Sequence, residues 1–146
     1  RRNPTNRNGG NVMGDRANFV FVQNNGETIV LYGHWAGHGM LANLAEAVAK
    51  AEPRWTDESY ATRIAISQMI GNGWSSETGW GLQVNEIADN EHKIPVIDWK
   101  GRTFSLHEED TFANTDNKVR GMKNEALFTM DLSAFVEKYS DVTLSV

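Results

Sequence analysis

The chain has 146 residues, enough for one domain whose core needs neither disulfides nor a metal for stability. It contains no cysteine, which excludes disulfides, thiolate-bound zinc, iron–sulfur clusters and cysteine nucleophiles. The net charge is −5, and residues 1–12 hold three arginines and no acid, so the remainder carries −8. Such an acidic body argues against general binding to nucleic-acid phosphates, which requires a basic surface.

The N-terminal residues 1–12 are rich in Asn, Gly and Arg and offer little to bury, which indicates a flexible arm or an added upstream extension. We expect the natural domain to begin at Met13 and to extend to residue 146. No apolar run approaches the roughly 20 residues of a membrane span, and the N-terminus lacks the layout of a signal peptide. The sequence therefore predicts a cytoplasmic protein without membrane association.

A β-hairpin is the first predicted element. Two apolar runs rich in aromatic and β-branched residues cover about 17–23 and 28–33. Between them, Asn24-Asn25-Gly26 has the tolerance for positive φ that a tight turn requires.

Two helices are predicted next. Residues 40–52 place leucine, valine and alanine at helical spacing, and Pro53 ends this run. A second helix is expected over 57–70, with Thr56 or Asp57 as its cap, because acids and an apolar face follow directly. A glycine-rich stretch then provides C-cap chemistry.

The second half of the chain reads as short strands followed by a terminal helix. Strands are predicted at 82–87, 94–98 and 103–107, where apolar residues lie between turn signals. The segment 111–124 is polar and predicts a loop, and 131–139 has the apolar face of a short helix. A final strand is expected at 142–146.

These elements do not alternate as βαβ units would, so they favour an α+β fold. We expect an antiparallel sheet of about five strands with the 40–52 and 57–70 helices on one face. Parallel central strands, or two separate cores, would contradict this arrangement. The expected core comprises Phe19, Phe21, Ile29, Leu31, Leu44, Val48, Ile64, Val84 and Phe104.

His34 and His38 raise the question of a metal site. Histidines four apart on a helix can share zinc, as in H-E-x-x-H, but glycines at 37 and 39 interrupt this segment and the glutamate is absent. We therefore expect no metal and no cofactor, and predict that His34 makes a fixed hydrogen bond. More distant ligands would have to come from Glu77, His92 or His107.

Three of the five tryptophans, Trp35, Trp74 and Trp80, occur in glycine-flanked loops. This setting suits a stacking or contact surface, because glycine lets a ligand or backbone approach closely. The alternative is that these rings cover the ends of the core. We expect the three, with His34, His38 and Arg16 nearby, to line one apolar patch, since binding residues concentrate on loops held by rigid elements.

Arg16 precedes the first strand and has two readings. It suits bidentate contact with a phosphate or carboxylate, or an ion pair with Asp15 or Asp98 that fixes the N-terminus. The sequence contains no P-loop, GxGxxG, GxSxG or HExxH pattern.

Four short motifs occur in a characteristic order over residues 13–107. They are Met13-Gly14-Asp15-Arg16-Ala17, Leu31-Tyr32-Gly33-His34-Trp35, Ile70-Gly71-Asn72 and Asp98-Trp99-Lys100. This order resembles a group of small proteins of uncharacterised function that are common in bacteriophages and mobile elements of Gram-positive bacteria. In that group Asn is commoner at position 15, and position 38 tends to be small or polar. The resemblance implies a phage-type accessory protein in a bacterial host and implies no particular activity.

Three functional hypotheses follow. The first is a non-enzymatic binder of a host protein or a small signalling molecule, with a homo-oligomer left open. The second is a small hydrolase or transferase acting on a nucleotide-like substrate, with His34 as base and Arg16 as anion clamp; the chain shows no obvious set of nucleophile, base and orienting group for it. The third is a virion component anchored by residues 1–12.

Overall fold

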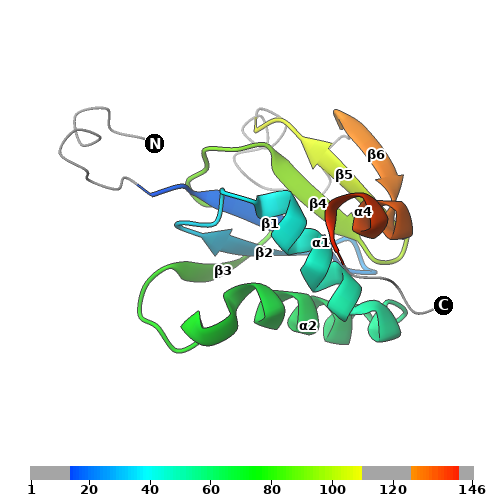
Figure 1. The fold of residues 1–146 in the computed structure, drawn as a ribbon, viewed down its shortest axis with the longest axis horizontal. Helices are drawn as coiled ribbons and strands as arrows, with labels where there is room; N and C mark the ends of the chain where they lie inside the picture. Colours follow the sequence, from blue (N-terminus) through cyan, green and yellow to red (C-terminus); the bar gives the residue numbers. More distant parts are fainter. Residues whose placement is uncertain (1–13, 110–125, 142–146) are drawn as a thin grey trace.

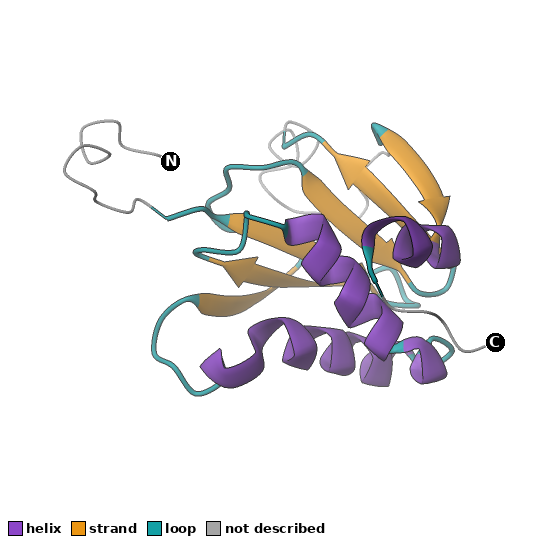
Figure 2. Ribbon diagram, viewed as in Figure 1, coloured by secondary structure: helices purple, strands orange, loops and turns teal. Residues whose placement is uncertain are grey.

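A single sheet with helices on one face forms the body of the protein, seen in a computed structural model that describes residues 14–109 and 126–141 (Figure 1). Within these residues the sheet has six strands, in the order β3-β2-β1-β4-β5-β6. Figure 2 shows α1 and α4 in front of the sheet and α2 next to α1, below the strands in this view. The strands are β1 Ala17–Val22, β2 Thr28–Gly33, β3 Trp80–Val84, β4 Ile94–Asp98, β5 Thr103–His107 and β6 Phe128–Asp131; the helices are α1 Met40–Lys50, α2 Glu58–Ile70 and α4 Leu132–Tyr139.

The first hairpin and the two long helices confirm the sequence prediction. β1 and β2 pair antiparallel with Val22 opposite Thr28. Asp57 caps α2, where its Oδ1 accepts a hydrogen bond from the Tyr60 backbone N–H at 3.5 Å. Short 3-10 turns at Glu52–Arg54 and Gly71–Gly73 follow α1 and α2.

The expectation of a purely antiparallel sheet is wrong. β1 and β4 lie side by side at the centre of the sheet and run parallel, with Val20 opposite Val96 and Phe21 opposite Ile97. Residues 85–93 carry the chain from β3 at one edge back to β4, on the far side of β1 from β2. Local patterns show that a strand exists but do not show which strand becomes its neighbour.

One further expectation, the count of about five strands, is corrected at the end of the chain. A sixth strand, β6, pairs with β5, and a third helix, α4, packs on the same face as α1. The predicted terminal helix is thus confirmed, beginning one residue later because Asp131 still belongs to β6. The predicted arm 1–12, the predicted loop 111–124 and the predicted strand 142–146 lie outside the described residues.

The main core lies between the sheet and the helices. Trp99 is almost fully buried, stacks on Phe21 with ring centroids 6.1 Å apart, and donates its Nε1–H to Thr62 Oγ1 at 2.9 Å. Phe104 stacks on Phe135 of α4 at 4.0 Å. These contacts join α2 and α4 to the strands.

A smaller apolar cluster lies on the opposite face of the sheet, so the expectation of one core is also corrected. It brings Val20, Val30 and Val96 together with Ile94 and with Ile87 from the β3–β4 connection. Among the predicted core residues Ile29 and Ile64 are only partly buried, and Val84 is wrong: it lies on the edge strand and is 65% exposed. The remaining predicted core residues are buried, namely Phe19, Phe21, Leu31, Leu44, Val48 and Phe104.

No helix within 14–109 or 126–141 combines the length and apolar character required to cross a bilayer.

Candidate functional site

An exposed apolar surface lies along β3, the edge strand next to β2. We call it the β3 edge surface and define it by Trp35, Trp74, Trp80, Leu82 and Val84. The exposed fractions of Trp35, Trp74 and Leu82 are 54%, 59% and 55%. Trp74, Trp80 and Leu82 line one shallow pocket of about 260 Å³. Large apolar patches on a protein surface are typical of interaction sites.

All three tryptophans lie near the start of β3, and the single patch predicted for them stays a prediction. Trp80 packs over Gly33, where a Cβ would lie 2.8 Å from its ring, and it also reaches the main core. Trp35 lies against Gly79, since a Cβ there would come 3.6 Å from its ring. Trp80 therefore fixes the strand, while Trp35 and Trp74 present their rings to solvent.

His34 lies next to this surface and contacts both Tyr32 and Trp35. Its Nδ1 is 2.8 Å from Tyr32 Oη, which confirms the predicted fixed hydrogen bond. Its ring meets Trp35 edge to face, with centroids 4.5 Å apart. His38 is exposed just before α1, and its side chain makes no hydrogen bond or ion pair with other described residues. His34 thus contacts Trp35, one of the three tryptophans.

Arg16 pairs with Glu91, rather than with Asp15 or Asp98 as the sequence suggested. Its Nη1 lies 3.7 Å from Glu91 Oε2, and the two side chains are 14% and 5% exposed. The Glu91 carboxylate also accepts a hydrogen bond from the Arg16 backbone N–H at 2.9 Å. Burial raises the pKa of the neighbouring Tyr32 phenol, and Arg16 partly opposes that rise. The charge of Arg16 is therefore used to fix the start of β1.

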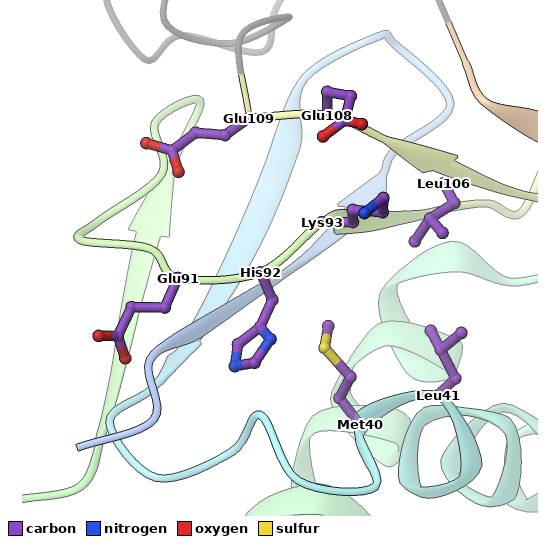
Figure 3. Close-up of a pocket in the computed structure, with 8 residues that line it drawn as sticks. All are labelled: Met40, Leu41, Glu91, His92, Lys93, Leu106, Glu108 and Glu109. Atoms are coloured by element: carbon purple, nitrogen blue, oxygen red, sulfur yellow. The ribbon is translucent and has the colours of Figure 1, made fainter. Parts of the chain in front are cut away.

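A second hollow, of about 650 Å³, lies between the start of α1 and the residues that flank β4 and β5 (Figure 3). Its apolar wall comes from α1 and β5, and its polar wall from the segments 91–93 and 108–109. Sequence reasoning missed it because three distant segments form it. The lining residues are Met40, Leu41, Glu91, His92, Lys93, Leu106, Glu108 and Glu109.

His92 and Asp15 form a polar pair beside this hollow. His92 Nε2 lies 2.5 Å from Asp15 Oδ1. An ionised carboxylate only accepts hydrogen bonds, so Nε2 donates in this contact. In Figure 3 the His92 ring points into the space beside Met40. A polar imidazole next to an apolar wall suits a small ligand that has both apolar and hydrogen-bonding groups.

No group of three or more His, Asp or Glu side chains suited to a metal ion occurs among the described residues. A comparison of the chain with protein-family models, with curated proteins and with solved structures found no match.

Proposed function

We propose that this is a phage-type accessory protein that acts by binding a host protein, without catalysis, in the bacterial cytoplasm. The observation that carries the proposal is the β3 edge surface, where Trp74, Leu82 and Val84 are all more than half exposed. Burying such apolar and aromatic area stabilises protein complexes, and tryptophan is among the residues that most often dominate binding energy.

Contacts with the rest of the fold hold the β3 edge surface rigid. Trp80 is anchored in the main core, and the His34–Tyr32 hydrogen bond holds the loop that carries Trp35. A rigid apolar surface loses little conformational entropy when a partner binds.

The hydrolase hypothesis receives less support. Arg16 is paired with Glu91, so the proposed anion clamp is occupied within the fold. A small-molecule ligand is the second candidate, favoured by the hollow beside the Asp15–His92 pair. The virion hypothesis depends on residues 1–12 and remains a prediction.

The test uses two exposed aromatic residues of similar exposure. The immobilised protein isolates a host partner, and the dissociation constant is then measured for Trp74→Ala and for Tyr60→Ala on α2, whose side chain is 48% exposed. Trp74→Ala is expected to weaken binding by about 2 kcal/mol, as for a hot spot. Tyr60→Ala is expected to bind like the wild type. Early melting of Trp74→Ala with unchanged affinity would place the binding site elsewhere.

A further inference from the structure

Among the described residues, no partner is found for the backbone groups along the outer edge of β3. The His34 N–H donates to the Gly79 carbonyl at 2.8 Å, and the Asn85 N–H donates to the Thr28 carbonyl at 3.1 Å. Backbone groups alternate in direction along an antiparallel ladder, so odd-numbered residues of β3 face β2. The N–H and C=O groups of Trp80, Leu82 and Val84 therefore face away from the sheet, and no described strand lies beyond them.

The side chains of these same three residues lie on the helix side of the sheet. Leu82 is opposite Leu31 and Val84 is opposite Ile29, both of which belong to or pack against the main core. A strand added at this edge would place every second side chain beside Leu82 and Val84. It would thereby cover the apolar groups that water now contacts.

Natural edge strands are commonly protected by charged residues, proline or bulges. β3 has none of these in its sequence, Trp80-Gly81-Leu82-Gln83-Val84. The opposite edge strand, β6, has only four residues and ends in Asp131. β3 is thus the edge that is suited to accept another strand.

The charged residues on either side of β3 indicate what kind of strand could pair with its outer edge. Glu77 precedes β3 and Glu86 follows it, and the sequence between Arg63 and Lys93 contains no lysine or arginine. A second copy paired antiparallel about Leu82 would bring Glu77 of one copy close to Glu86 of the other. It would also join two chains of charge −5 each. Like charges at an interface act against a partner, and opposite charges favour it.

From these observations we infer that β3 binds an extended segment of its partner by strand addition, and that this segment has apolar side chains at alternate positions and lysine or arginine at both ends. This inference rests on the proposed function, because it describes how the β3 edge surface recognises a protein. Main-chain hydrogen bonds would supply affinity and the flanking cations would supply selectivity.

The test titrates the full chain with two synthetic peptides that share the core Val-Thr-Val-Thr-Val. One carries two lysines at each end and the other carries two glutamates. The lysine peptide is expected to bind about tenfold more tightly at low salt, with the difference shrinking at high salt because exposed charges are screened. Binding should slow hydrogen exchange of the Trp80, Leu82 and Val84 amides, whereas the Gly81 and Gln83 amides already face β2.

Matched variants assign the preference to the two carboxylates. Glu77→Gln combined with Glu86→Gln is expected to reduce the difference between the peptides, and Glu46→Gln on the exposed face of α1 is expected to leave it unchanged. If both peptides bind equally well and protect the β3 amides, the partner segment does not need lysine or arginine at its ends, and that part of the inference is wrong. Protection of these amides by self-association of the chain alone would overturn the choice of occupant.

The failure of this inference is separable from failure of the proposed function. If neither peptide binds and the isolated partner leaves the β3 amides unprotected while still depending on Trp74, strand addition is wrong and the proposed function stands. If the partner does not depend on Trp74, the proposed function itself fails.

Discussion

Leu82 lies directly opposite Leu31 across the β2–β3 ladder, yet Leu31 is completely buried and Leu82 is 55% exposed. Replacing Leu31 by Ala removes buried methyl groups and should lower the free energy of unfolding by about 2–5 kcal/mol. Leu82→Ala should change it by no more than about 0.5 kcal/mol, as for an ordinary surface position. Urea unfolding of both variants measures the contrast. Equal losses would show that Leu82 is covered in solution.

The Arg16–Glu91 pair is expected to be costly to break. Both side chains are largely buried, so Glu91→Gln leaves the guanidinium without its counter-charge. Removing one partner of a buried pair typically lowers the free energy of unfolding by about 3–5 kcal/mol. Glu46→Gln, at an exposed position of α1, serves as the control and should have little effect. A loss for Glu91→Gln no larger than the control's would mean that the pair does not stabilise the fold.

Because His107 is buried, we expect the folding stability of the protein to depend on pH. Burial lowers the pKa of its imidazole below the ordinary value of 6.5. The unfolded chain then takes up a proton at higher pH than the folded chain, so folding stability is highest above pH 6.5 and is lost as the pH falls through the folded pKa. We expect the melting temperature to fall as the pH is lowered from neutrality.

The control for this pH effect uses the exposed His38. His107→Gln should flatten the dependence of the melting temperature on pH between about 7 and 5, where histidine titrates. His38→Gln should retain the wild-type slope. The explanation would fail if both variants kept the wild-type slope.

Gly37 lies so close to the Asp15–His92 pair that a side chain at this position would clash with it. A Cβ at Gly37 would overlap both His92 Nε2 and Asp15 Oδ1. Gly37→Ala should therefore separate the two side chains and shift the ¹⁵N resonances of the His92 imidazole. Gly81→Ala is the control, because its Cβ would be 3.9 Å from the nearest atom, Tyr32 Cδ2. Unchanged His92 resonances in Gly37→Ala would refute the pairing.

The sequence alone determined the elements whose cause is local. The Asn24-Asn25-Gly26 turn specified the first hairpin, and Asp57 specified the start of α2. The sequence also predicted that His34 makes a fixed hydrogen bond, but it did not identify Tyr32 as the partner. These features depend on residues within a few positions of one another, so the pattern along the chain contains the necessary information.

Only the tertiary structure decided which distant segments became neighbours. β4 lies parallel to β1, which leaves β3 at an edge of the sheet. Val84 is therefore exposed, although its apolar side chain had suggested a place in the core. His92 meets Asp15 across 77 positions of sequence. Such contacts arise from the way whole layers pack against one another, and hydrophobic attraction is non-directional, so the residue types by themselves do not choose among the arrangements that would bury them.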